Sequence, residues 1–281
     1  MFDTHCHLNF KAFKKTLPDV ITRAHESGIT NIVIPGTDVK TSKRAVEIAQ
    51  AHEDIYAAVG IHPHHAYKLI KKEELSEKND QITVQRELDE IEKLLTEEKV
   101  VAVGEIGMDR HMYEETVYEN YAINDKFIEI QKELLEKQIN LAKKYKKSLI
   151  FHNREAKIDV LSILRDHWNV VFEYKAVFHC CEPDEELLAF AKEHKMFLGV
   201  DGDITYYPEK QAFIKNVPLE MLVLETDSPF LLPEPLKTER KYPNEPKNIA
   251  LFVKLIADLK ETTKDEIINI TTANARTLFG L

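Results

Sequence analysis

The sequence predicts an α/β fold, a closed (β/α)8 TIM barrel, and three observations support it. Apolar runs with strand character recur eight times along the chain, and helical patterns lie between them. Strands that alternate with helices pair in parallel through right-handed crossovers. The chain has 281 residues, close to the ~250 that are typical of this barrel. A doubly wound open sheet, which alternates strands and helices in the same way, is the alternative.

The predicted strands are the apolar runs that are too short to be helices. They cover residues 1–3, 31–34, 55–59, 100–103, 148–151, 176–178, 196–200 and 222–224. In this barrel the active site forms at the carboxyl ends of the strands. Polar side chains that directly follow these runs are therefore the candidates for chemistry.

The predicted helices are marked by apolar residues spaced three and four apart. One such set is Phe127, Ile130, Leu134, Leu141 and Tyr145, and another is Ile249, Phe252, Val253, Ile256 and Leu259. Thr263 with Glu266 fits a capping box before a last helix at 264–279, which we expect to close the outer ring. In Asn244-Glu245-Pro246, the Asn fits a helix cap and the Pro an early helical position.

Two stretches go beyond a minimal barrel. Residues 68–99 are charge-rich and contain an amphipathic helix marked by Leu88, Ile91, Leu94 and Leu95. Residues 110–125 form a polar excursion that contains tyrosines. Both follow predicted strands, so both are placed to shape the rim of a cleft; solvated surface decoration is the alternative for the first. Because we find no internal repeat and no linker, we expect residues 1–281 to form one domain.

The formal net charge of −10 argues against broad electrostatic attraction to nucleic acid. A phosphate substrate is still compatible with this charge, because a bound pair of metal ions inverts the local field. The densest basic run is Lys143, Lys144, Lys146 and Lys147. It falls at a predicted helix end, where cations match the helix dipole, and away from the strand exits.

The composition also bears on location. No apolar run approaches the roughly 20 residues of a membrane helix, and the first residues resemble neither a basic leader nor an apolar signal segment. The 3 cysteines, of which Cys180 and Cys181 are adjacent, make a poor disulfide framework and fit a reducing compartment. We therefore expect a cytoplasmic protein, monomeric and without a membrane partner.

Five segments place a metal-ligand residue type at the exit of a predicted strand. These residues are His5 with His7, Glu105, His152, His179 and Asp227. In an extended strand His5 and His7 point to one face, and Asp3 shares that face and is placed to orient one imidazole. The carboxylate of Glu105 can bridge two cations, with Gly104 and Gly107 letting the backbone turn tightly around it.

Each segment considered alone has a structural alternative. His152 and His179 each follow a Phe at a strand end, where a lone His is more often a hydrogen-bonded core residue. Asp227 is placed to bind an ion and to take a proton from water, whereas Glu225 should point to the opposite face and have a structural role. Because the five segments meet at one end of one predicted barrel, they jointly predict a dinuclear hydrolytic metal site.

At these residues the chain resembles the TatD family of metal-dependent hydrolases, the TatD-type deoxyribonucleases, within the wider amidohydrolase-like barrel group. The matching segments run in family order over nearly the whole chain: residues 2–8, Gly60-Ile61-His62-Pro63-His64, Gly104-Glu105-Ile106-Gly107-Met108-Asp109, His152-Asn153-Arg154-Glu155-Ala156, Phe178-His179-Cys180, Glu225-Thr226-Asp227-Ser228-Pro229 and Asn244-Glu245-Pro246. So many matches in order argue against an accidental similarity.

The resemblance implies two divalent metal ions, which mixed imidazole and carboxylate ligands allow to be Mg, Mn or Zn. The implied ligands are His5, His7, Glu105 and Asp227 for one ion, and Glu105, His152 and His179 for the other. It also implies cleavage of DNA phosphodiester bonds, often from the 3′ end of single strands. Two cations can hold the attacking hydroxide and stabilise the leaving oxygen, while Asp227 positions or deprotonates the water.

Two further residues are candidates for substrate contacts. His62 and Arg154 lie in matching segments and are placed to grip phosphate oxygens, Arg154 by its planar fork. For His62 the alternative is a rigid turn whose imidazoles face solvent. For Arg154 the alternative is an ion pair with a nearby carboxylate.

The chain departs from the family's pattern near the predicted cleft. Cys181-Glu182-Pro183-Asp184 stands where the family usually has an aromatic and a small Ser/Thr-Gly pair, and Asp201-Gly202-Asp203 replaces a more neutral turn. These acids would repel a polyanion unless they point outward or help to bind cations. Residues 108–111 also lack the aromatic that commonly follows the Asp. Cys6 and Cys180, beside candidate ligands, should face away as buried thiols.

We therefore predict a divalent-metal-dependent deoxyribonuclease, a 3′–5′ exonuclease that acts on single-stranded or frayed DNA. The alternative is a hydrolase of the same barrel group for a small amide, lactone or cyclic ureide, which the acidic charge favours. A non-catalytic binding protein is the third hypothesis, and the filled set of expected ligand positions argues against it.

Overall fold

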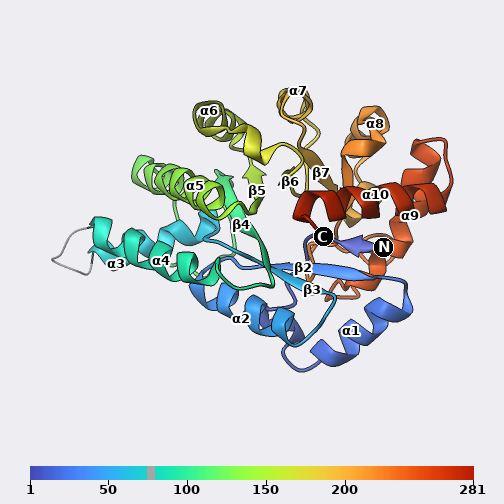
Figure 1. Ribbon diagram of the computed structural model, residues 1–281, viewed down its shortest axis with the longest axis horizontal. Helices are drawn as coiled ribbons and strands as arrows, with labels where there is room; N and C mark the ends of the chain where they lie inside the picture. The colour runs from blue at the N-terminus through green and yellow to red at the C-terminus, as the bar shows by residue number, and fades with distance from the viewer. Residues whose placement is uncertain (75–79) are drawn as a thin grey trace.

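The computed structural model describes residues 1–74 and 80–281, and within them the side chains other than those of 71–74 and 80–83. In this part of the chain, eight parallel strands form one sheet in the sequential order β1 to β8 (Figure 1). The strands are β1 Phe2–Asp3, β2 Asn31–Pro35, β3 Ile55–Val59, β4 Val100–Asp109, β5 Ser148–Arg154, β6 Ala176–Phe178, β7 Phe197–Val200 and β8 Leu222–Leu224. A doubly wound sheet requires the strand order to reverse, so this order excludes it. The predicted barrel is confirmed.

The seam between β8 and β1 is joined just beyond the ends of these short strands. The amide of Thr4 donates to the carbonyl of Leu224 (3.0 Å), and the amide of Asp227 donates to the carbonyl of His5 (2.9 Å). Cys6 and Ser228 form an isolated parallel bridge. The barrel is thus nearly closed, and its joint brings the segments that follow β1 and β8 side by side.

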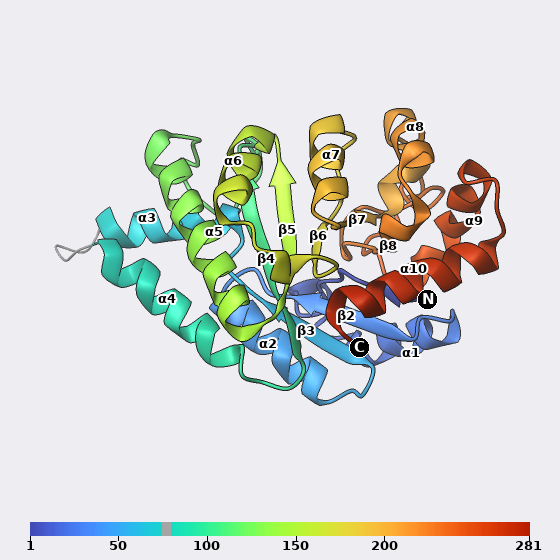
Figure 2. The same cartoon turned by 45° about the horizontal axis from the view of Figure 1, so that its top comes forward.

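The helices surround the sheet, as Figure 1 and Figure 2 show from two directions. They are α1 Leu17–Glu26, α2 Val39–Gln50, α3 Ala66–Glu74, α4 Asp80–Leu94, α5 Asp125–Tyr145, α6 Lys157–His167, α7 Glu185–Glu193, α8 Pro208–Asn216, α9 Ile249–Leu259 and α10 Lys264–Phe279. The helix predicted within 68–99 corresponds to α4, whose Leu88 and Ile91 are buried; residues 75–79 of that stretch lie outside the described part. The basic run near Lys143 lies at the carboxyl end of α5, as predicted.

The interior of the barrel is filled by one side chain from each strand. These residues are Phe2, Val33, Ala58, Ala102, Ile150, Val177, Phe197 and Val223. Ala275, Leu278 and Phe279 from the end of α10 pack against them. The hydroxyl of Ser148, the first residue of β5, donates to the carbonyl of Leu278 (2.5 Å). The last helix packs against α9 and β8, as expected for the outer ring, and its final turn also seals the amino ends of the strands.

The predicted helix caps are only partly observed. Thr263 caps α10, since its hydroxyl accepts from the amide of Glu266 (3.1 Å), but the Glu266 carboxylate bonds the hydroxyl of Thr262 rather than returning to Thr263. Asn244 does not cap a helix: its side-chain amide donates to the carbonyl of Thr226 (3.0 Å). Pro246 starts a short 3₁₀ turn, Pro246–Asn248, that leads into α9. Asn244 therefore fixes the loop after β8.

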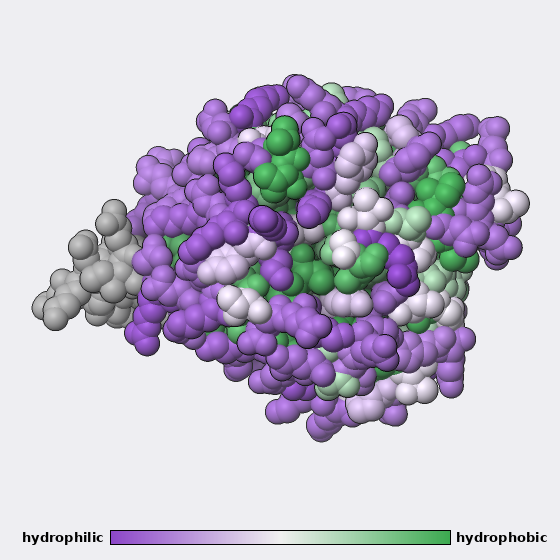
Figure 3. Space-filling model, viewed as in Figure 1, coloured by the Kyte–Doolittle hydropathy of each residue, from purple (hydrophilic) through white to green (hydrophobic). Residues whose placement is uncertain are grey.

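The outer surface agrees with the composition, in which 31% of residues are charged. On the face drawn in Figure 3, hydrophilic side chains predominate and hydrophobic ones form small separate groups. Among the helices described, none combines the length and the apolarity needed to cross a membrane.

Candidate metal centre

A β-bulge in β4 determines where Glu105 points. Val103 pairs with Leu149 and Ile106 with Phe151, so three steps along β4 match two along β5. The extra residue reverses the alternation of side chains. Ala102 faces the barrel interior before the bulge, and after it Ile106 packs in the outer core. Glu105 therefore faces inward from within a strand, whereas the predicted strand ended at residue 103.

The two glycines around Glu105 allow this close approach of β4 to β5. A Cβ on Gly104 would lie 2.7 Å from the Cβ of Ile150, and one on Gly107 would lie 1.9 Å from the carbonyl oxygen of His152. Gly107 also has a φ of +154°. They were expected to form a tight turn, but they lie in a continuous strand and make room for its neighbour.

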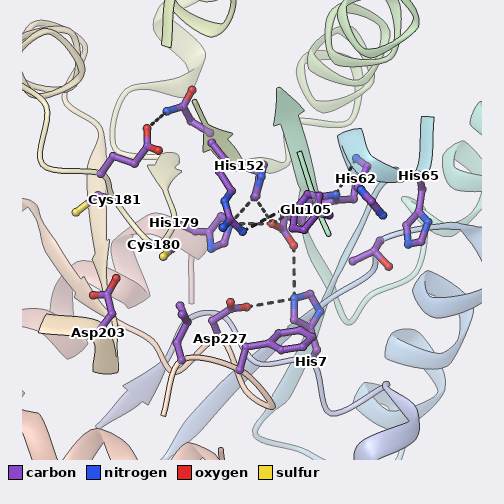
Figure 4. Close-up of a pocket in the computed structure, with 18 of the residues that line it drawn as sticks. His7, His62, His65, Glu105, His152, His179, Cys180, Cys181, Asp203 and Asp227 are labelled. Carbon is purple, nitrogen blue, oxygen red and sulfur yellow. Dashed lines mark hydrogen bonds and ion pairs between the residues drawn. The ribbon is translucent and has the colours of Figure 1, made fainter. Parts of the chain in front are cut away.

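The first group of candidate ligands joins the segments after β1 and β8 to Glu105. The Nε2 atoms of His5 and His7 are 3.2 Å apart. Oε2 of Glu105 lies 3.4 Å from the His5 nitrogen and 3.5 Å from the His7 nitrogen. Oδ1 of Asp227 lies 3.6 Å and 3.4 Å from the same two atoms. Potential ligand atoms of His5, His7 and Asp227 thus lie within 4.8 Å of one another, with Oε2 of Glu105 beside the two imidazoles; Figure 4 labels His7, Glu105 and Asp227 of this group.

The second group surrounds the other oxygen of Glu105. Oε1 lies 2.7 Å from Nε2 of His179 and 2.9 Å from Nδ1 of His152. These two nitrogens are 3.2 Å apart. Nε2 of His62 lies 3.2 Å from the same oxygen. Glu105 therefore stands between two clusters of imidazoles, with His7 on one side and His152 and His179 on the other, as Figure 4 shows.

His62 lies closer to this centre than expected. Its side chain is 12% exposed, so the alternative of a solvent-facing turn is wrong for this residue. Its Nδ1 accepts from the amide of His64 (3.0 Å), which leaves Nε2 directed at Glu105. His62 is therefore placed among the candidate ligand atoms as well as at the floor of the cavity.

Asp109 is a site residue to which the sequence reasoning assigned no role. Its Oδ2 lies 3.1 Å from Nε2 of His152, and its two oxygens accept from the amide of His111 and the hydroxyl of Tyr113, both at 2.8 Å. Burial opposes ionisation, but His152 and the other donors outweigh it and hold the pKa of Asp109 well below its usual range. Positions 105, 107 and 109 share one face of β4, and this spacing was the available signal.

Asp3 was expected to orient an imidazole, and it does not. Its carboxylate accepts from the amide of Thr226 (3.0 Å), the hydroxyl of Thr226 (2.7 Å) and the amide of His5 (3.3 Å). Asp3 therefore holds the backbone of the two segments that carry His5 and Asp227, whose amide already bonds the His5 carbonyl.

Glu225 was predicted to face away from the site, and this was wrong. Val223 faces the interior, and a strand period of two directs residue 225, the first after β8, the same way. Oε1 of Glu225 accepts from the amide of Cys180 and lies 3.7 Å from Nδ1 of His179. A Cβ on Gly199 would lie 2.4 Å from this carboxylate. Burial raises the pKa of Glu225 well above its usual value, so a neutral carboxyl fits this pocket.

The spacing of the first group fits a divalent cation. Four ligands arranged tetrahedrally at about 2.1 Å from an ion lie about 3.4 Å from one another, and the five distances above among His5, His7, Glu105 and Asp227 range from 3.2 to 3.6 Å. Imidazole nitrogens with carboxylate oxygens are also a usual donor set for Zn and Mn. His5, His7 and Asp227 can therefore hold one ion, with Oε2 of Glu105 beside the two imidazoles. Glu105 with His152 and either His62 or His179 can hold a second.

The carboxylates set the charge of the imidazoles before any ion binds. Burial alone would lower the pKa of His7, but Asp227 and Glu105 outweigh it and raise the pKa to about 9. In the same way Asp109 and Glu105 raise the pKa of His152 to about 10. His5 differs, because burial and the neighbouring His179 lower its pKa to about 4. The ion-free site therefore holds protons at two positions where a cation would bind.

A cavity of about 910 Å³ opens over both groups of candidate ligands. The excursion after β4 contributes Tyr113, Thr116 and Val117 to its wall, so the prediction that 110–125 shapes the rim is confirmed. Arg154 also lines the cavity. Its guanidinium lies 5.0 Å from the centre of the Tyr113 ring and donates to the hydroxyl of Tyr113 (3.2 Å), rather than pairing with a carboxylate.

The acids that were expected to repel a polyanion have partners. Nζ of the buried Lys210 lies 3.0 Å from Oδ2 of Asp201 and 2.6 Å from Oδ1 of Asp203. Glu182 accepts from the side chain of Asn153. Cys180, expected to face away, instead lines the cavity. Burial raises the pKa of its thiol well above the ordinary value, so it is a poor nucleophile.

A barrel that gathers imidazoles and carboxylates at the carboxyl ends of its strands defines a class, the metal-dependent hydrolases. The sequence pattern of the TatD related DNase family matches residues 2–280, and the chain belongs to this family. It is accordingly an enzyme of the hydrolase class, as the sequence predicted.

Relatives along the full length support this assignment. The chain is 34% identical to the uncharacterized metal-dependent hydrolase YabD of Bacillus subtilis, covering 100% of this chain and 99% of that protein. It is 29% identical to the 3′-5′ ssDNA/RNA exonuclease TatD of Edwardsiella piscicida, covering 100% of both. The crystal structure of YJJV, a TatD homolog from Escherichia coli, superimposes with a TM-score of 0.82 at 28% identity, covering 100% of this chain and 98% of that one.

Proposed function

We propose that this protein is a divalent-metal-dependent deoxyribonuclease, a 3′–5′ exonuclease acting on single-stranded or frayed DNA ends through one barrel domain. The observation that carries the proposal is the position of Glu105, whose two oxygens face two separate groups of imidazoles on the floor of an open cavity. The naming of a full-length relative as a 3′-5′ ssDNA/RNA exonuclease favours a single-stranded nucleic acid as the substrate.

In this proposal the ligands of one ion are His5, His7, Glu105 and Asp227, and those of the other are Glu105, His152 and His179. Two bound divalent ions, Mg, Mn or Zn, would neutralise charge on the phosphoryl oxygens and lower the pKa of water. Glu105 fixes the spacing of the two positions because a single carboxylate faces both groups.

The remaining roles belong to side chains of this chain. Asp227, at the cavity floor, is the acceptor for a proton of the attacking water. Asp109 fixes the orientation of the His152 ring through its second nitrogen. Arg154 and His62 both line the cavity and are the proposed contacts to phosphate oxygens.

Bound cations would make the charge of the cavity more favourable for an anionic substrate. Among the described residues, the cavity-lining acids are Glu105, Glu115, Glu182, Asp203, Glu209 and Asp227. The Lys and Arg residues in the same lining are Arg154 and Lys210, and Lys210 is committed to two aspartates. In the ion-free site the protonated His7 and His152 offset part of this charge; two divalent ions in their place would carry more positive charge and should strengthen phosphate binding.

The test uses purified protein stripped with a chelator and reloaded with Mg, Mn or Zn. A single strand labelled at its 5′ end should shorten stepwise from the 3′ end only after reloading, and Glu105→Ala protein should leave it intact. If the reloaded protein left the strand intact while a known nuclease degraded it, the proposal would fail.

A small-substrate hydrolase is the second candidate, because Glu115 and Glu209 add negative charge to the cavity lining. It would be favoured if a small amide, lactone or cyclic ureide turned over faster than every oligonucleotide tested. We also propose a cytoplasmic location, since Cys6, Cys180 and Cys181 are all free and suit a reducing compartment.

A further inference from the structure

An exposed phenylalanine stands beside the candidate metal centre. Phe230 is 47% exposed and lines the cavity. It lies in the turn directly after β8, where its amide donates to the carbonyl of Asp227 (2.9 Å). Isolated exposed apolar side chains are ordinary on a protein surface. This ring, however, lies inside a cavity and three residues from a candidate ligand, where an apolar surface has a use for binding.

The Phe230 ring has two aromatic neighbours, His7 and Phe10. Its centroid lies 6.5 Å from that of His7 and 6.2 Å from that of Phe10, both in edge-on arrangements. Phe10 itself stacks on His7 at 4.3 Å with an interplanar angle of 16°. Phe10 thus stacks on the His7 imidazole, whereas Phe230 meets both rings in T-shaped contacts and remains 47% exposed at the cavity wall.

The other aromatic rings of the wall have closer partners than Phe230, whose nearest ring centroid lies 6.2 Å away. The hydroxyl of Tyr113 donates to Asp109, and the guanidinium of Arg154 lies over its ring. Tyr207, 45% exposed, packs against Tyr206 at a centroid distance of 4.8 Å. Phe230 is therefore the aromatic ring best placed to accept a planar group of the substrate.

We propose that Phe230 is the stacking platform for the base of the 3′-terminal nucleotide. This inference rests on the proposed function and names the recognition element of the same site. The separation of 6.5 Å between the His7 and Phe230 rings lies within the span of one nucleotide, from its phosphate to its base. Every base has a π-face, so stacking of this kind tolerates any sequence.

Stacking also suits the charge of this cavity. Proteins that bind single strands usually combine aromatic platforms with a basic groove. This cavity is lined by more acids than Lys and Arg side chains. Lys210 is paired with two aspartates, so among the described residues Arg154 is the one Lys or Arg of the lining that has no aspartate partner. An uncharged ring supplies affinity without a basic groove, and the salt dependence of binding should be correspondingly shallow.

The experiment pairs protein variants with matched oligonucleotides. The substrates are two single strands that differ only at the 3′-terminal nucleotide, which carries either a base or an abasic sugar analogue. The proteins are wild type, Phe230→Ala, Phe230→Trp and the control Tyr174→Ala, whose side chain is 51% exposed and outside the cavity lining. Cleavage gives kcat/KM, and fluorescence anisotropy with a non-hydrolysable terminal methylene linkage gives Kd.

Wild type and the Tyr174 control should prefer the terminal base over the abasic end by roughly tenfold in both kcat/KM and Kd. Phe230→Ala should lose this preference, and Phe230→Trp should keep it, which separates loss of the ring from misfolding. The inference is overturned if Phe230→Ala keeps the wild-type ratio or if wild type shows no preference. If wild type cleaves neither strand but binds the base-bearing one better in a Phe230-dependent way, the nuclease proposal fails and the stacking site stands.

Discussion

Asp109 lies against the far nitrogen of His152. Its Oδ2 is 3.1 Å from Nε2, while Nδ1 of the same ring faces Glu105 at 2.9 Å. A carboxylate in this position fixes the ring and makes the imidazole a better ligand. Asp109 and His152 are diagonal neighbours across β4 and β5, because the backbone of Asp109 is in register with Arg154 and that of Gly107 with His152.

The variant Asp109→Asn should therefore weaken the second ion site. We expect metal affinity at that site to fall about 10–100-fold, with the first site retained, in a calorimetric titration of chelator-stripped protein. Asp159→Asn is the matched control, since that carboxylate bonds Arg110 rather than a histidine. Equal affinity in wild type and Asp109→Asn would show that the contact has no role in metal binding.

The variant Asp227→Asn should remove turnover and keep the fold, because the proton acceptor is lost and the side-chain volume is retained. A fall of about 10²–10⁴-fold in the single-turnover rate at saturating metal is expected, with an unchanged circular-dichroism spectrum. Asp265→Asn in the first turn of α10 is the control. Turnover at the wild-type rate would refute the role given to Asp227.

Metal binding should release protons. Carboxylates raise the pKa of His7 to about 9 and of His152 to about 10, so near neutral pH a metal ion must displace these protons. Affinity should rise as the pH approaches 9, and the calorimetric enthalpy near pH 7 should change with the ionisation enthalpy of the buffer. An enthalpy independent of the buffer would contradict this prediction.

The same pKa values predict the stability of the ion-free protein. A histidine whose pKa is higher in the folded than in the unfolded protein stabilises the fold, and this contribution is complete below the ordinary pKa of 6.5. It is lost as the pH rises through about 9 for His7 and about 10 for His152. Ion-free protein should thus unfold at a lower urea concentration near pH 10 than near pH 7. The urea midpoint of metal-loaded protein should fall less over the same pH range.

Lys210 should be essential for stability, because its removal leaves Asp201 and Asp203 buried without a cation. Lys210→Met should cost about 3–5 kcal/mol in the free energy of unfolding, measured by urea denaturation. Lys215→Met, on the exposed side of the same helix, should change stability little, and adding Asp201→Asn and Asp203→Asn to Lys210→Met should recover part of the loss. A Lys210→Met protein as stable as wild type would contradict the pairing.

Much of the fold could be predicted because its signals are local. Apolar runs of strand length and the three-and-four spacing of helices marked the elements, and their alternation implied the parallel barrel. The position of the last turn of α10 could not be read in this way. Its Leu278 and Phe279 close the amino ends of the strands through contacts with residues from all parts of the chain.

Part of the candidate site could likewise be predicted from local sequence signals, and part could not. His152, His179 and Asp227 follow apolar runs, and the structure brings them near one another as expected. The inward direction of Glu105 depends on the bulge opposite Leu149 and Phe151, which nothing in the β4 sequence alone indicates. The ion pairs of Asp201 and Asp203 with Lys210 connect the segment after β7 to α8, and the sequence pattern did not indicate them either.

The central claim is that Glu105 bridges two divalent ions, and an anomalous-scattering map of crystals of the metal-loaded protein tests it most directly. We expect two peaks, one touching His5, His7 and Asp227 and the other touching His152 and His179, with one oxygen of Glu105 bound to each. A single peak, peaks away from these side chains, or Glu105 oxygens bound only to protein atoms would contradict the claim.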